Sequence, residues 1–472
     1  MYDQINNLVL KADNIVWGLP LIILLLSLGT FLTFRLRLLQ VFHLPKALKY
    51  MLKDEEGGEG EVSTFGALCT ALSATIGTGN IVGVATAVVA GGPGALFWMM
   101  VSAFLGMTTK YAEGLLAIKY RTVDEKGHVL GGPFYYIEHG LGSKWKPLAK
   151  MFAFFGMFAG LFGTGTFSQI SGITSAVKAV FDPDTTKVVT FLGRNYSICV
   201  LITGLLITIC AALVIIGGLK RISSFSEIVI PFMAITYVVT CLLLLILNAS
   251  AIPHAFYVIF KGAFDPAAIT GGAIGSIIVV AQKGIARGIF SNEAGLGSAP
   301  IAAAAARSNE PVRQGLVSMT GNFFTIIICT MTGLCIVITD AWSKTGLEAA
   351  EITSYAFKNG LPFPAVVSAT ILMLCLSFFA FTTITGWNYY SARCAEYLSN
   401  GNKTFVKVFN GLYIAALFVG PYLTADLLWN CADVFNGLMA LPNLIAIFFL
   451  SSVVVKETNS YFERLKAKNG MK

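Results

Sequence analysis

The chain of 472 residues is 56% hydrophobic and only 12% charged, and its mean hydropathy is +0.73. Soluble domains carry roughly 25% charged residues. The composition therefore excludes a soluble enzyme, a disordered chain and a disulfide-rich scaffold, and it indicates a protein embedded in a lipid bilayer. The nine cysteines lie in or beside apolar runs without CxxC or Cys/His spacing, which argues against a metal or redox centre.

Eleven stretches are apolar and long enough to cross a bilayer, which takes ~20 residues. The first is not a cleavable signal peptide, because no basic segment precedes it and Arg35 and Arg37 follow it. Only short connectors join the spans, so we expect one transmembrane domain over residues 1–472. The expected spans are 14–34, 63–91, 94–118, 150–180, 196–217, 224–247, 268–306, 314–339, 364–397, 405–424 and 427–455.

The placement of basic residues predicts how the chain is oriented. Lys and Arg number 33 against 25 Asp and Glu, a net charge of +8. With eleven spans the loops alternate sides, and 23 of the 33 basic residues fall in one set of loops and 7 in the other. Because loops rich in Lys and Arg face the cytoplasm, we expect a multi-pass cell-membrane protein with its N-terminus outside and its C-terminus in the cytoplasm. The positive charge thus reflects topology, and we expect no nucleic-acid partner.

Two glycine-rich clusters interrupt long apolar spans. The first covers residues 73–80 with the sequence SATIGTGN, and the second covers residues 284–295 with the sequence GIARGIFSNEAG. In lipid every backbone N–H and C=O must be bonded internally, so we interpret these clusters as unwound segments whose freed groups bind a ligand. Close helix packing is the alternative use of small residues, but it does not account for the Thr, Asn, Ser and Glu beside these glycines.

The two clusters occupy corresponding positions in two halves of the chain. One interrupts the first span of a five-span block, residues 63–247, and the other interrupts the first span of a second block, residues 268–455. An odd number of spans per block inverts the second block relative to the first. This layout predicts an inverted-repeat secondary transporter, with 14–34 as an extra helix.

Four motifs also resemble the signatures of the alanine or glycine:cation symporter family. They are GTGNIVGVAT at 77–86, GGPFYYIE at 131–138, GIFSNEAGLGSAP at 288–300 and TGWNYY at 385–390. The resemblance implies an all-α integral membrane fold of eleven transmembrane helices, in which a five-plus-five inverted repeat (LeuT-type) follows one extra helix. It also implies sodium-coupled uptake of a small neutral amino acid.

Substrate-binding residues are expected at and between the two interruptions. An amino acid needs donors for its carboxylate and acceptors for its ammonium group, and unwound backbone supplies both without burying a full charge. Gln169 is an uncharged amide at membrane depth that must find a partner, and Trp387 could close a small apolar pocket. The expected substrate-binding residues are Thr78, Gly79, Asn80, Gln169, Gly288, Ile289 and Trp387.

Sodium ligands are expected where the first interruption meets the span 364–397. By similarity with the sodium site common to this fold, Ser73 and Ile76 would supply backbone carbonyls, and hydroxyls would come from Thr382 and Thr383, with Thr385 as a spare. Neutral oxygens suit a monovalent ion that must also leave. The alternative is that each Thr hydroxyl bonds a carbonyl of its own helix.

Other functions fit the sequence less well. The spans contain no nucleophile with a base and no metal cluster, so we expect no enzyme, and the isolated polar patches do not form the continuous lining of a channel. Within transporters, proton coupling or a larger substrate such as glutamine remains open. Glu293 is a candidate for gating or proton coupling, or for capping the second interruption or pairing with Arg287. The expected partners are the amino acid, Na⁺ and the bilayer, with no obligate protein partner evident.

Overall fold

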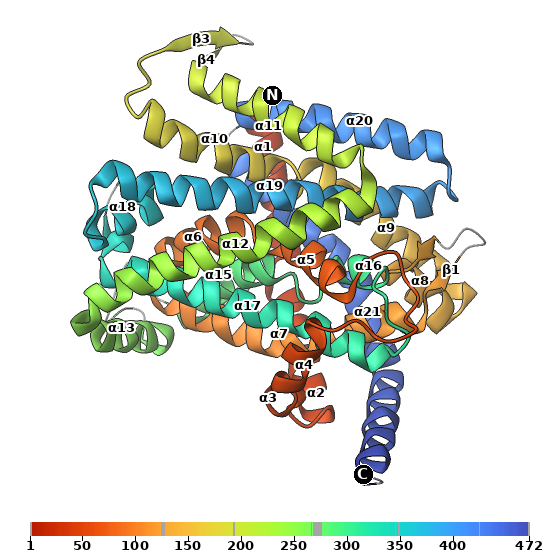
Figure 1. Ribbon diagram of the computed structural model, residues 1–472. Helices are drawn as coiled ribbons and strands as arrows, with labels where there is room; N and C mark the ends of the chain where they lie inside the picture. The colour runs from red at the N-terminus through yellow and green to blue at the C-terminus, as the bar shows by residue number, and fades with distance from the viewer. Residues whose placement is uncertain are drawn as a thin grey trace.

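The computed structural model describes residues 2–123, 128–191, 194–265, 267, 276–344, 346–347, 350–423 and 425–470. The described chain is almost wholly helical (Figure 1). Two short antiparallel hairpins interrupt this all-α pattern. They pair β1 (Thr122–Val123) with β2 (Val129–Leu130), and β3 (Val188–Phe191) with β4 (Arg194–Ser197). Residues 268–275, where the expected second repeat begins, lie outside the described residues.

Within the described part of the chain, eight helical segments are long and apolar enough to span a membrane. They coincide with eight of the eleven expected spans. The remaining three are the two spans with glycine clusters and the span 94–118, which contains Lys110 and Glu113. The first glycine-containing span is present as two shorter apolar helices, Thr64–Thr75 and Val82–Gly91. The all-α membrane architecture is therefore confirmed, while the number eleven stays a prediction.

The first half of the chain supplies the extra helices and the first expected repeat. Its helical segments, including the short 3-10 and π-helical turns, are α1 (Tyr2–Val16), α2 (Leu19–Arg35), α3 (Leu39–Phe42), α4 (Leu44–Met51), α5 (Thr64–Thr75), η1 (Thr78–Asn80), α6 (Val82–Gly91), α7 (Gly94–Lys119), α8 (Pro133–Tyr135), η2 (Tyr136–Gly140), η3 (Ser143–Trp145), α9 (Lys146–Phe162), α10 (Phe167–Phe181), α11 (Ile198–Ile215) and α12 (Gly218–Leu247).

The second half of the chain contains the second expected repeat. Its segments are η4 (Ala249–Ala251), α13 (Ile252–Phe264), α15 (Ile277–Asn292), α16 (Ala299–Ala303), α17 (Pro311–Ile338), η5 (Ala341–Ser343), α18 (Ala350–Gly360), α19 (Ala365–Leu398), α20 (Lys403–Val419), η6 (Gly420–Tyr422) and α21 (Ala425–Gly470). Both α5 and α15 end at a break and are followed by a second short helix, α6 and α16.

Packing brings the two broken spans together in the middle of the molecule. Helix α7 packs along α15 and α17, while α19 packs against α5, α9 and α10. Figure 1 shows α5, α15 and α16 enclosed by these longer helices. The breaks therefore lie inside protein, which is the condition under which irregular backbone is tolerated at membrane depth.

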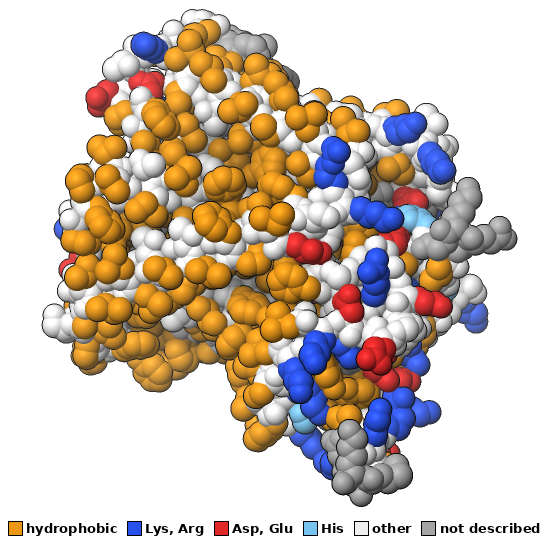
Figure 2. All heavy atoms as spheres, viewed as in Figure 1, with side chains coloured by type: hydrophobic (Ala, Val, Ile, Leu, Met, Phe, Trp, Pro, Cys, Tyr) orange, Lys and Arg blue, Asp and Glu red, His pale blue; other side chains and the backbone are white. Residues whose placement is uncertain are grey.

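The surface is divided between an apolar face and a charged end. In Figure 2 hydrophobic side chains cover the left and centre of the view, and Lys, Arg, Asp and Glu gather at the right and below. Exposed apolar residues on the outer helices include Leu213, Ile228 and Phe232, which are 60%, 74% and 66% exposed. Such a continuous apolar surface suits contact with lipid rather than water.

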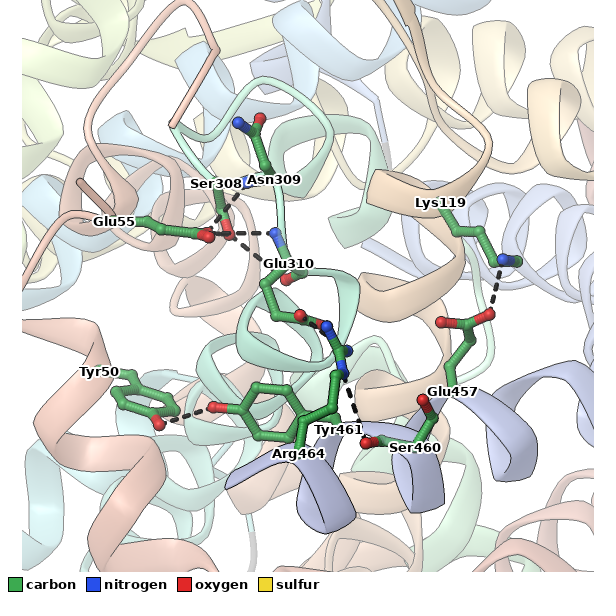
Figure 3. Close-up of polar contacts among 10 residues, drawn as sticks. All are labelled: Tyr50, Glu55, Lys119, Ser308, Asn309, Glu310, Glu457, Ser460, Tyr461 and Arg464. Carbon is green, nitrogen blue, oxygen red and sulfur yellow. Dashed lines mark hydrogen bonds and ion pairs between the residues drawn. The ribbon is translucent and has the colours of Figure 1, made fainter. Parts of the chain in front are cut away.

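The last part of α21 is fixed to the rest of the charged end by polar contacts. Figure 3 shows Glu457 paired with Lys119 of α7 at 2.7 Å, and the Tyr461 hydroxyl 2.6 Å from that of Tyr50 on α4. Arg464 pairs with Glu310, the residue before α17, at 3.0 Å. These contacts join α21 to α4, α7 and α17 outside the apolar belt.

Candidate functional site

The first break lies against α19. Helix α5 ends at Thr75, Ile76 has extended backbone, and a single 3-10 turn precedes α6. The Asn80 side chain accepts a hydrogen bond from the Gly77 N–H at 3.1 Å, which replaces part of the lost helical bonding. A Cβ on Gly77 would come within 2.4 Å of Thr383 Oγ1, so this close approach requires glycine.

Gln169 connects α10 to this break. Its Oε1 accepts a hydrogen bond from the Thr78 N–H at 3.1 Å, and its Nε2 donates to the Thr164 carbonyl at 3.0 Å. Gln169 is 1% exposed, so the amide satisfies buried backbone that has no helical partner. The Thr78 hydroxyl is also buried, and no hydrogen-bond partner for it is found among the described residues. Thr78 thus presents an unused polar atom beside the break.

Oxygen atoms converge where α5 meets α19. Thr383 Oγ1 lies 2.8 Å from the Ser73 carbonyl, 3.4 Å from the Ile76 carbonyl and 3.0 Å from the Phe379 carbonyl of its own helix. A hydroxyl has one proton to donate, so three carbonyls compete for it. This cluster of neutral oxygens fits a hard cation such as Na⁺, which would satisfy the carbonyls that the single proton cannot.

The neighbouring threonines of α19 bond within their own helix. Thr382 Oγ1 donates to the Phe379 carbonyl at 2.9 Å, and Thr385 Oγ1 donates to the Thr382 carbonyl at 2.9 Å. Of the four expected sodium ligands, the structure therefore groups Ser73, Ile76 and Thr383, while the Thr382 hydroxyl is engaged by its own helix.

The second break is capped by a carboxylate from another helix. Helix α15 ends at Asn292, and α16 begins at Ala299. Glu113 Oε1 on α7 accepts hydrogen bonds from the backbone N–H groups of Gly295 and Gly297 at 3.2 and 3.1 Å. Asn443 Nδ2 on α21 donates to the same oxygen at 2.7 Å and to the Gly295 carbonyl at 2.9 Å. The three-residue spacing of Lys110 and Glu113 on α7 does not reveal these contacts.

Glu293 lies at the start of this break and connects it to two other helices. Its backbone is left-handed, with φ 55°. Its Oε1 accepts a hydrogen bond from Trp387 Nε1 at 2.7 Å, and its Oε2 accepts bonds from Ser298 Oγ at 2.7 Å and Thr75 Oγ1 at 3.4 Å. The expected alternative pairing with Arg287 is not the one found, since Arg287 lies 3.0 Å from Asp433 of α21.

The two breaks touch each other. A Cβ on Gly79 would come within 2.9 Å of the Phe290 ring and 3.2 Å of Ser291 Cα. Cys329 of α17 bridges them, because its sulfur accepts a hydrogen bond from Asn80 Nδ2 at 3.4 Å and lies 3.0 Å from Ser291 Oγ. No sequence pattern singles out Cys329, which resembles any apolar core residue.

The remaining expected substrate residues are all buried. Trp387 is inaccessible and Ile289 is 3% exposed. Gly288 faces α7 rather than the first break, because a Cβ there would meet Ser102 Oγ at 2.5 Å. The structure thus groups four of the expected substrate residues at the first break: Thr78, Gly79, Asn80 and Gln169. Trp387 is linked to the second break through Glu293, and Gly288 makes a packing contact with α7.

Comparisons with known proteins agree on one family. A family model for the sodium:alanine symporters matches residues 2–472. The sodium/alanine symporter AgcS of Methanococcus maripaludis is 46% identical over 98% of this chain and 99% of its own, and the probable sodium/glutamine symporter GlnT of Bacillus subtilis is 34% identical over 99% and 93%. The crystal structure of MhsT in complex with L-phenylalanine has the same fold, with a TM-score of 0.55 at 12% identity over 85% of this chain and 98% of that one.

Proposed function

Because the chain belongs to the sodium:alanine symporter family, we propose that it couples the entry of Na⁺ to the uptake of alanine or glycine by alternating access. Membership makes the chain a membrane transporter and not an enzyme, and it supports sodium-coupled amino acid symport as the general activity. We choose a small substrate because the relative at 46% identity is a sodium/alanine symporter.

The observation that carries the proposal is the oxygen cluster between α5 and α19. Ser73 and Ile76 offer carbonyls that share one hydroxyl proton of Thr383. In the proposed sodium-bound state the ion replaces that proton as their partner, and Thr382 contributes only if its hydroxyl leaves the Phe379 carbonyl. Na⁺ is thus the coupling ion and is bound by neutral oxygens.

The proposed amino acid site lies beside this cluster at the two breaks. The unwound backbone of Thr78, Gly79 and Asn80 holds the α-carboxylate, and Gln169 gives up the Thr78 N–H when substrate binds. Ile289 and Trp387 form the apolar wall that limits the side chain, and Gly288 allows α15 to approach α7 closely. Glutamine is the second candidate substrate, because a relative at 34% identity is a probable sodium/glutamine symporter.

Alternating access follows from the proposed repeats, residues 63–247 and 268–455, with the N-terminus outside and the C-terminus in the cytoplasm. Sodium at α5 organises the same backbone that receives the substrate. Each ligand therefore raises the affinity of the other by the same factor. This mutual stabilisation is what makes transport of one depend on the other.

The test is uptake of radiolabelled alanine into proteoliposomes under an inward Na⁺ gradient, compared with K⁺ and with a proton gradient. We expect concentrative uptake only with Na⁺ and competition by unlabelled glycine. Uptake driven by protons without Na⁺ would refute the sodium site. Competition by glutamine but not by glycine would replace the proposed substrate while keeping the ion.

A further inference from the structure

Three ionisable side chains are buried together beside the proposed sodium site. Lys110 and Glu113 of α7 and Glu293 of the second break are 2%, 0% and 0% exposed. No other Asp, Glu, Lys or Arg side chain in the described part of the chain is under 3% exposed. Lys110 interacts electrostatically with both carboxylates. We call Lys110, Glu113 and Glu293 the buried charge cluster.

The cluster carries a net charge of −1 when all three groups are ionised. Glu113 accepts hydrogen bonds from three donors, and Glu293 accepts them from Ser298 and Trp387, while the Thr75 hydroxyl near Glu293 donates to the Ala71 carbonyl at 2.8 Å. Accepting hydrogen bonds without donating any suits the ionised form of a carboxylate. The second oxygen of Glu113 is buried, and among the described residues no hydrogen-bond partner is found for it. A negative charge without a partner in the membrane interior raises the free energy of the protein. One more positive charge bound near the cluster would lower it.

Thr75 places this charge next to the proposed sodium ligands. Its hydroxyl lies 3.4 Å from Glu293 Oε2, and Ile76, whose carbonyl faces Thr383, is the next residue. Thr75 and Lys110 also line one cavity of about 10 Å³ between α5, α7, α16 and α17. Glu293 and Lys110 therefore lie beside the end of α5 without contributing a direct ligand to the ion.

We propose that Glu293 is the counter-charge of the coupling sodium ion, with Lys110 opposing it, so that the net −1 of the buried charge cluster sets the affinity for Na⁺. The sodium ligands themselves are neutral, so attraction for the ion comes from this nearby charge. Glu293 is a positioning residue. It acts through its contact with Thr75 and through the electrostatic field of its own negative charge. The inference rests on the proposed sodium site.

The test is the affinity for ²²Na⁺ of purified protein in lipid nanodiscs. Glu293→Gln brings the net charge of the cluster to zero and should weaken Na⁺ binding by about tenfold. Lys110→Gln brings it to −2 and should tighten binding. The double variant restores −1 and should bind Na⁺ within about twofold of the wild-type protein. Glu463→Gln, which removes an exposed carboxylate near the end of α21, is the matched control and should leave the affinity unchanged.

Opposite shifts of the two single variants would be the signature of charge, since a merely structural role would weaken binding in both. Shifts in the same direction, or none, overturn the inference. If Lys110→Gln fails to fold by thermal melting, the double variant must still bind Na⁺ at least about fivefold more tightly than Glu293→Gln, and equal affinity overturns the inference. A wild-type protein that binds no Na⁺ would instead refute the proposed function itself.

Discussion

The proposed sodium site depends on contacts between single atoms at the first break. Gly77 leaves room for Thr383 Oγ1, and that hydroxyl can then reach the carbonyls of Ser73 and Ile76. Adjacent residues on a helix point about 100° apart, which is why Thr383 faces α5 while Thr382 bonds Phe379 of its own helix. The adjacent threonines in the sequence suggest a site lined by hydroxyls, but they do not show which of them faces α5.

Replacing Gly77 by alanine tests this close approach. The added Cβ would meet Thr383 Oγ1 at 2.4 Å and Gln169 Oε1 at 3.0 Å. Forcing these contacts apart should cost roughly 1–3 kcal/mol of stability and should weaken Na⁺ binding. Gly83→Ala is the control, because a Cβ there meets nothing within 4 Å in helix α6. A thermal melt in which both variants match the wild-type protein would contradict the packing argument.

At the scale of elements, glycine clusters located both breaks, but the residue that caps the second break comes from a distant part of the chain. Helices α5 and α15 end inside the two clusters, as the need to bond backbone in lipid predicts. Glu113 and Lys110 are three residues apart on α7, a spacing that by itself suggests only a pair within one helix. The hydrogen bonds of Glu113 instead reach Gly295 and Gly297, 182 and 184 residues away. Sequence patterns report neighbours on the same helix, and not the distant loop that folds back onto it.

A second element-scale feature joins the β1–β2 hairpin to α19. His128 lies 3.0 Å from Glu61, which precedes α5, and 3.4 Å from Glu396 of α19. Hydrogen bonds to Glu396 and Glu61 raise the pKa of His128 to about 9 from its ordinary 6.5. A raised pKa means that the protonated His128 stabilises the folded state, fully below pH 6.5 and less as the pH rises through 9.

The pH dependence of stability tests this ion-pair group. We expect the melting temperature of the wild-type protein to fall between pH 7 and pH 10 by more than that of His128→Gln, which lacks the titrating group. His139→Gln is the control, because His139 also lies between α7 and α9 in the chain and contacts the Tyr120 carbonyl instead of a carboxylate. If the melting temperatures of wild type and His128→Gln depend on pH in the same way, the protonated His128 does not stabilise the folded state.

At the scale of the whole molecule, the two halves of the chain meet at their breaks. The Gly79–Phe290 contact, the Cys329 bridge and the Glu293 hydrogen bonds link α5, α15, α17 and α19. Composition and basic-residue placement predicted a membrane protein, and paired clusters predicted the broken spans. Asn80, Glu293 and Trp387 could be singled out from the sequence, but their contacts with one another and the bridge through Cys329 could not, because these residues come from elements far apart in the sequence.

The central claim is that sodium at the α5–α19 cluster prepares the amino acid site. The most direct measurement is equilibrium binding of radiolabelled alanine to the purified protein in Na⁺ or in K⁺ at equal ionic strength, for wild type and for Thr383→Val. We predict that Na⁺ raises the alanine affinity of the wild-type protein by about tenfold or more, within the range of typical coupling energies, and that Thr383→Val loses most of this effect. Equal alanine affinity of the wild-type protein in Na⁺ and K⁺, or full sodium dependence in Thr383→Val, would contradict the account.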